Sequence, residues 1–272
     1  MSKTSQQFIL ARCEKLMLMT TCRVSDQMRY YEADLPLRPK ESTWLSLIGH
    51  NHEWIGMGPT TNQVSLGIPA IGGTLLADLT LPSDASGLVV FCHGSGSNRH
   101  SPRNLHVAGH LQRGGLATLL FDLEHNSDQV DGRTLASLPP LQQRLLSVID
   151  WTSSQPALKS LELGLFGAST GAALALAAAV ERPLRVKSVV SRGGRPDLVF
   201  QCLGDVRCPV LLIVGGHDLD VLELNAWAAG QLQVRNELVV IPQASHLFSE
   251  PGSLDAVADQ TYWWFMNQFK QD

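Results

Sequence analysis

The sequence predicts an α/β fold in which a mostly parallel sheet carries helices on both faces. From residue 60 onward, short apolar runs alternate with stretches of helical character, a rhythm typical of parallel sheets. Several runs, such as LVVFC at residues 88–92, are apolar throughout, as expected for strands buried on both faces. One run leads directly into a serine flanked by glycines and then into a helix of small residues, at 161–182. This segment is the centre of the functional prediction.

The predicted elements follow one another in a regular order. Residues 64–68 and 74–81 alternate apolar and polar side chains around a turn, which predicts an antiparallel hairpin at a sheet edge. Further strands are predicted at residues 88–92, 116–123, 161–166, 186–191, 210–214 and 237–241. Helices are predicted at residues 101–112, 138–153, 219–232 and 254–269, directly after Gly171, and briefly from Pro196. Three aromatic residues of the last helix are expected in the core: Trp263, Trp264 and Phe265.

The chain divides into an N-terminal appendage, residues 1–59, and a main domain, residues 60–272. The appendage has a helical pattern at residues 6–20 and then several prolines and glycines without a sustained period. His50 and His52 alternate within it, but no cysteine lies near them, and a metal site is not predicted there. The main domain is long enough to enclose one large core.

Composition excludes several classes of function. A formal net charge of −4 argues against a nucleic-acid or anionic-membrane partner. The five cysteines are an odd number without a C-x-x-C pair, which indicates a reduced, cytoplasmic protein without a zinc site. The apolar run at residues 8–19 contains three charged residues, so it predicts neither a signal peptide nor a membrane span. No metal or organic cofactor is expected, and oligomeric state is left open.

The five residues Gly167-Ala168-Ser169-Thr170-Gly171 match the G-x-S-x-G nucleophile elbow. The elbow forces its central residue into strained backbone geometry, and small neighbours avoid the resulting clashes. A strand before this pattern and a helix after it give the context that the motif requires. Ser169 is therefore the predicted nucleophile.

A serine nucleophile needs a histidine base, and the histidine needs a carboxylate to orient it. Asp218 follows the predicted strand at residues 210–214, and His246 follows the next strand, so both side chains are expected beyond the carboxyl ends of parallel strands. We assign Asp218 as the orienting acid and His246 as the general base. Asp220 is an alternative acid because either aspartate could instead cap a helix, and His217 is expected to be a turn residue.

The loop HGSGS, residues 93–97, follows a buried strand and is the predicted oxyanion loop. In this arrangement one backbone N–H comes from that loop and another from the residue after the nucleophile. The amides of Ser95 and Thr170 are therefore the predicted oxyanion donors. Glycine-rich phosphate loops are the alternative, but neither a P-loop lysine nor a ribose-binding acid is present. Cys92, just before the loop, is expected to be inert packing.

Together the HGSGS loop, the GASTG elbow, GGHD at residues 215–218 and ASH at residues 244–246 resemble an α/β-hydrolase of the dienelactone hydrolase family. The likeness covers residues 64–269, and HGSGSNRHSPRN and SRGGRPDL resemble a subgroup of small hydrolases. Dienelactone hydrolase itself has cysteine where this chain has Ser169. The resemblance therefore implies the α/β-hydrolase fold and a triad more strongly than dienelactone as substrate. Some relatives are fused to phosphoribosyltransferase domains, and no such domain is recognised here.

The sequence thus predicts a serine hydrolase acting on a small-molecule carboxylic ester, thioester or lactone. A peptidase or thioesterase is the alternative within the enzyme class, and a catalytically retired hydrolase fold used for binding is the alternative outside it. Too few residues follow the strand at 186–191 to build a cap domain.

Arg99 and Arg103 follow the oxyanion loop and are candidate ligands for a negative substrate group, with the segment 191–195 facing them. The alternative is that they brace loops by pairing with Asp122, Glu124 or Asp197.

Overall fold

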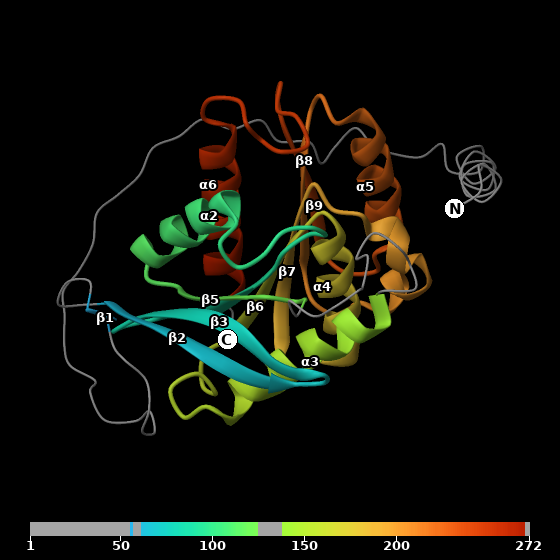
Figure 1. Cartoon of the computed structure of the whole chain (residues 1–272). Helices are drawn as coiled ribbons and strands as arrows, with labels where there is room; N and C mark the ends of the chain where they lie inside the picture. Colours follow the sequence, from blue (N-terminus) through green and yellow to red (C-terminus); the bar gives the residue numbers. More distant parts are fainter. Residues whose placement is uncertain (1–54, 57–60, 125–137, 270–272) are drawn as a thin grey trace.

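A computed structural model of the chain describes residues 55–56, 61–124 and 138–269. These residues form one nine-stranded sheet with the order β1-β2-β3-β5-β4-β6-β7-β8-β9 (Figure 1). The strands are β1 Ile55–Gly56, β2 Thr61–Ala70, β3 Gly73–Pro82, β4 Leu88–Cys92, β5 Ala117–Phe121, β6 Leu163–Ala168, β7 Val186–Arg192, β8 Val210–Gly215 and β9 Asn236–Ile241. From β5 to β9 the neighbouring strands are parallel, which confirms the predicted fold class.

The hairpin of β2 and β3 is antiparallel, as predicted, and joins the parallel part through β5. Its strands are longer than the alternation of the sequence indicated, because pairing continues to Ala70 opposite Gly73 at the turn. The two residues of β1 pair with Gln63 and Asn62 of β2. A part of the predicted appendage therefore adds a short strand to the edge of the main sheet, while the helix predicted at residues 6–20 lies outside the described residues.

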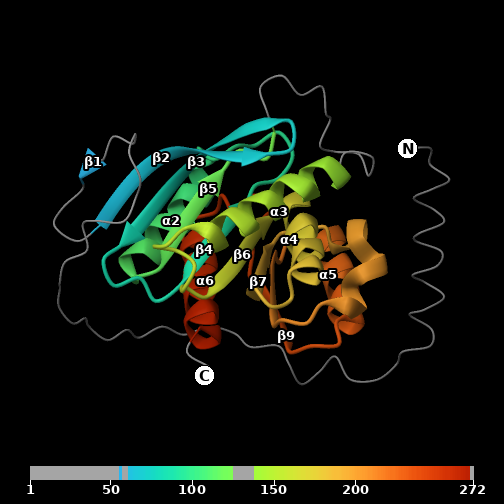
Figure 2. The ribbon, with the colours of Figure 1, turned by 90° about the horizontal axis from the view of Figure 1, so that it is seen from below.

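Helices cover both faces of the sheet. The described helices are α2 Pro102–Arg113, α3 Leu138–Ser154, α4 Thr170–Glu181, α5 Leu219–Gln231, α6 Ser253–Gln268 and the 3-10 helix η2 Pro196–Asp205. Strand β4 shows the two faces: Val89 and Phe91 belong to the core on the side of α2 and α6, whereas Val90 and Cys92 belong to the core on the side of α3, α4 and α5. Figure 2 shows these two layers from below.

Both cores are apolar and closely packed. The rings of Phe91 and Phe166 lie 4.9 Å apart between their centroids, so neighbouring strands are also tied by their side chains. In α6, Trp264 and Phe265 are buried, as expected. The expectation was wrong for Trp263, which is 39% exposed because it lies on the helix face turned away from the sheet.

The parallel strands place their carboxyl ends at one edge, where ligands bind in this class of fold. Between β7 and β8 the chain contains only η2 as a regular element. This confirms the prediction that no separate cap domain is inserted there. Among the described residues, no helix combines the length and the apolar character needed to cross a membrane.

Candidate active site

Ser169 lies at the turn between β6 and α4 with φ 52° and ψ −121°. A non-glycine residue with this backbone is strained, and the strain is the property predicted for the nucleophile elbow. The flanking glycines permit it. A Cβ at Gly167 would lie 2.4 Å from Ala172 Cα, and a Cβ at Gly171 would lie 2.2 Å from the carbonyl oxygen of Cys92. A larger residue at either position would clash with the backbone of this same chain, at Ala172 or at Cys92.

The structure brings the predicted acid and base together. Asp218 Oδ2 lies 2.6 Å from His246 Nδ1, within a strong hydrogen bond. Asp218 occupies the N-cap position of α5, but its side chain makes no capping hydrogen bond. The carboxylate is therefore directed to the imidazole and not to the helix, and His246 Nε2 is left available to a substrate-side partner.

Close backbone packing explains how two loops from different strands meet. A Cβ at Gly215 would lie 2.3 Å from the carbonyl oxygen of Ala244, so only glycine lets the end of β8 approach the histidine loop. Glu250 Oε2 accepts the Ser245 N–H at 3.0 Å and closes that loop on itself. This hydrogen bond lowers the pKa of the Glu250 carboxyl.

The two alternative residues do not share this arrangement. Asp220 lies in the first turn of α5 and is exposed. His217 is also exposed, and its backbone N–H donates to the carbonyl of Ala244 at 3.0 Å, as a turn residue does. The geometry therefore favours Asp218 and His246.

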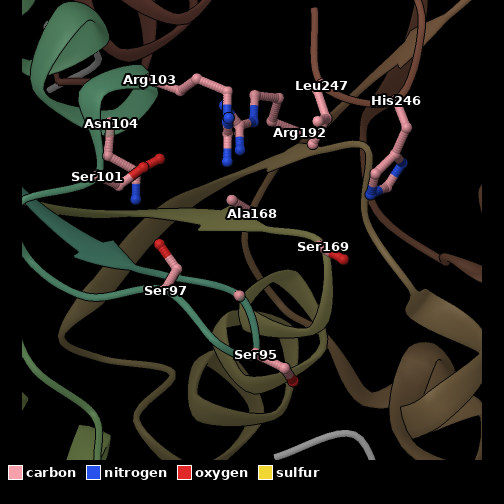
Figure 3. A pocket seen from close by; sticks show the side chains of 11 residues that line it. Ser95, Ser97, Ser101, Arg103, Asn104, Ala168, Ser169, Arg192, His246 and Leu247 are labelled. Atoms are coloured by element: carbon pink, nitrogen blue, oxygen red, sulfur yellow. The ribbon is translucent and has the colours of Figure 1, made fainter.

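A cavity of about 150 Å³ opens at this point (Figure 3). It is lined by Gly94, Ser95, Ser97, Ser101, Arg103, Asn104, Ala168, Ser169, Arg192, His246 and Leu247. Ser169 and His246 thus face the same space, although no hydrogen bond joins their side chains among the described contacts. Catalytic hydrogen bonds are often longer in ligand-free enzymes and shorten when substrate binds.

His93 holds the predicted oxyanion loop in place through two hydrogen bonds, which the sequence did not predict. Its Nε2 accepts the Leu123 N–H at 2.9 Å, so its Nδ1 carries the proton and donates to the Gly94 carbonyl at 3.0 Å. Burial lowers the pKa of His93 and keeps the ring neutral, as this pattern requires.

The predicted oxyanion donors lie beside each other, but one of them is already bonded. The Ser95 N–H donates to Thr170 Oγ1 at 2.9 Å. Thr170 also carries the second predicted amide at the N-terminus of α4, directly after Ser169. To serve as an oxyanion donor, the Ser95 amide must exchange the threonine hydroxyl for the substrate oxygen.

The two arginines predicted to bind substrate have different surroundings. Arg99 Nε pairs with Asp78 at 3.1 Å and its Nη1 pairs with Asp122. Its side chain does not line the cavity, so the structure corrects the prediction: Arg99 braces the loop after β4. Pairing with Asp122 is one of the loop-bracing alternatives predicted from the sequence. Arg103 does line the cavity, as does Arg192.

Neither a cysteine nor a metal site competes with Ser169 in the described part. Burial raises the pKa of the Cys92 thiol strongly, which keeps it protonated and unreactive. The described residues contain no cluster of three histidine, cysteine or acidic side chains that could hold a metal ion.

A strained serine between a strand and a helix, on a mostly parallel sheet with helices on both faces, defines the α/β-hydrolase class. A solved structure of dienelactone hydrolase from Anabaena variabilis is 47% identical, covers 77% of this chain and 99% of its own, and superposes with a TM-score of 0.74. The chain belongs to the dienelactone hydrolase family. No family model matches it.

More distant structures share the fold alone. Est1E from Butyrivibrio proteoclasticus is 18% identical over 76% of this chain and 99% of its own, with a TM-score of 0.66. An α/β serine hydrolase without lid from Xanthomonas campestris is 22% identical over 77% of this chain and 96% of its own, with a TM-score of 0.62.

Two Mycobacterium tuberculosis proteins, provisionally named phosphoribosyl transferases, are 49% identical over 189 residues, 70% of this chain. The match spans only 43% of their length.

Proposed function

We propose that this protein hydrolyses a carboxylic ester, thioester or lactone through an acyl-enzyme formed on Ser169. The observation that carries the proposal is the 2.6 Å contact between Asp218 and His246 beside a strained serine in one cavity. The solved structure that is 47% identical is named a dienelactone hydrolase, which supports a hydrolase. The transferase name belongs to proteins more than twice as long as the matched segment, so it does not guide the proposal.

The first half of the proposed reaction forms the acyl-enzyme. His246 Nε2 takes the proton of the Ser169 hydroxyl as its Oγ attacks the carbonyl carbon, and Asp218 stabilises the imidazolium. The amides of Ser95 and Thr170 donate to the oxyanion of the tetrahedral intermediate. When the intermediate collapses, His246 returns the proton to the departing alcohol or thiol.

Water completes the proposed cycle. His246 takes a proton from a water molecule that attacks the acyl carbon, and the Ser169 oxygen recovers a proton as the carboxylic acid leaves. No step requires a metal or an organic cofactor.

Steady-state kinetics on p-nitrophenyl esters of graded chain length tests the proposal. Ser169→Ala is expected to lower kcat by about 10³-fold or more, because the nucleophile is lost while binding persists. Ser249→Ala is the matched control, since Ser249 is an exposed serine near the histidine but outside the cavity lining.

Hydrolysis that survives Ser169→Ala, or that is confined to p-nitroanilides, would contradict the proposal. The second result would instead favour a peptidase.

A further inference from the structure

Two guanidinium groups share the cavity beside Ser169 without a carboxylate partner among the described residues. Arg103 comes from the first turn of α2 and Arg192 from the end of β7, and their nitrogen atoms gather in one place (Figure 3). Nε and Nη1 of Arg192, and Nε of Arg103, are buried without a hydrogen-bond partner within the described part. Arg192 is only 7% exposed.

The backbone holds Arg192 close to the nucleophile. It pairs with Ala168 across β6 and β7, and its carbonyl accepts the Ser169 N–H at 3.1 Å. The guanidinium carbon lies 5.9 Å from the centre of the Phe248 ring, within cation–π range. Arg192 is therefore built into the wall of the site and is not a mobile surface side chain.

Folding alone does not explain this arrangement, because burying an unpaired charge is unfavourable. Burial, and next the positive charge of Arg103, lower the pKa of Arg192 to about 10. The guanidinium therefore keeps its proton near neutral pH, and two like charges face one small space. Arg99 shows the contrast, since two carboxylates hold it outside the cavity.

The donors fit a phosphate better than a single carboxylate. A phosphomonoester carries a charge of about −1.5 to −2 at neutral pH and three acceptor oxygens, whereas a carboxylate offers one charge and two oxygens. The hydroxyls of Ser97 and Ser101 line the same cavity and can donate to a third oxygen. Arg103 also lies in the first turn of α2, where the helix dipole favours an anion.

We propose that Arg103 and Arg192 bind a phosphate group of the substrate, within a few bonds of the carbonyl carbon that Ser169 attacks. The substrate class is then a small phosphorylated ester, thioester or lactone. The phosphate site is argued from the positions of Arg103 and Arg192 alone. The ester, thioester or lactone nature of the substrate rests on the proposed function.

Calorimetric titration with methyl phosphate tests the site without catalysis. At about pH 8, where a phosphomonoester is dianionic, the Ser169→Ala protein is expected to bind it at least about tenfold more tightly than acetate at equal ionic strength. Arg192→Met and Arg103→Met are each expected to weaken binding by about tenfold or more.

Arg195→Met is the matched control. Arg195 lies three residues from Arg192 but pairs with Asp197 through two nitrogens, at 2.8 and 2.7 Å, and does not line the cavity. Its loss is expected to change the affinity for methyl phosphate by less than about twofold. Arg192→Met is expected to keep or raise the temperature of unfolding, because it removes an unpaired buried charge.

The outcomes separate the two proposals. No binding of methyl phosphate, equal binding after Arg192→Met, or acetate bound as tightly as methyl phosphate would overturn the phosphate site. If wild-type protein hydrolyses p-nitrophenyl acetate but the methyl phosphate titrations give any of these results, only the phosphate site is wrong. If methyl phosphate binds as expected but no ester is cleaved, the phosphate site stands and the proposed function fails.

Discussion

The two sides of the cavity differ in how their charged groups are partnered. On one side, Asp218 and His246 satisfy each other across 2.6 Å, and the surrounding loops are closed by their own hydrogen bonds. On the other side, Arg103 and Arg192 face the same space with buried nitrogens that no described residue pairs. The hydrogen bond between the acid and the base already holds both in place to act on a substrate. The buried arginines lack a partner in the described protein, which indicates that the substrate supplies the anion.

The largest effect predicted here concerns the paired side. Asp218→Asn is expected to lower kcat by on the order of 10³- to 10⁴-fold, because an amide favours the wrong histidine tautomer and stabilises the imidazolium poorly. Asp220→Asn, an exposed aspartate two residues away, is the matched control and is expected to stay within about twofold. Steady-state rates on a p-nitrophenyl ester measure both. The reverse ranking would move the acid to Asp220 and remove the basis of the comparison.

A smaller effect is expected where the oxyanion loop meets the elbow. Thr170→Val removes the hydroxyl that accepts the Ser95 N–H in the ligand-free protein. Releasing a hydrogen bond of about 1 kcal/mol is expected to raise kcat/KM by up to about fivefold, because the amide no longer exchanges partners during the reaction. Thr170→Ser keeps the hydroxyl and is expected to behave as wild type. A tenfold fall in Thr170→Val would show that the hydroxyl itself stabilises the oxyanion.

The smallest catalytic effect is expected for Arg99, which sharpens the contrast between a bracing arginine and the cavity arginines. Arg99→Met leaves Asp78 and Asp122 without their cation and is expected to lower the free energy of unfolding by about 1–2 kcal/mol. The Arg99→Met enzyme is expected to show the same ratio of rates on a carboxylated and a neutral acyl ester as the wild-type enzyme. Chemical denaturation and paired kinetics measure the two effects. A reduced preference for the charged ester would return Arg99 to the substrate site.

Much of the site could be predicted because local motifs fix it. The elbow of Ser169 needs glycines at set positions, and strand ends of a parallel sheet place Asp218 and His246 at one edge. The ion pairs of Arg99 and the burial of Arg192 beside the cavity could not be predicted from local motifs. Asp78, which binds Arg99, lies on the hairpin strand β3, and only the β3–β5 pairing brings it beside the loop after β4.

Contacts that depend on side-chain conformation were also beyond the sequence. The bond from the Ser95 N–H to Thr170 Oγ1 depends on one rotamer, and the hydrogen bond that His93 accepts from Leu123 depends on the end of β5, which the motif does not include. The exposure of Trp263 depends on the rotation of α6 about its axis, which a run of three aromatic residues does not define.

The central claim is that Ser169 forms the covalent intermediate, and peptide mapping after fluorophosphonate labelling tests it most directly. The label is expected on the tryptic peptide of residues 160–185, at Ser169, in wild-type protein and to be absent after Ser169→Ala. A label on Ser95 or Cys92, or equal labelling of the Ser169→Ala protein, would contradict the account.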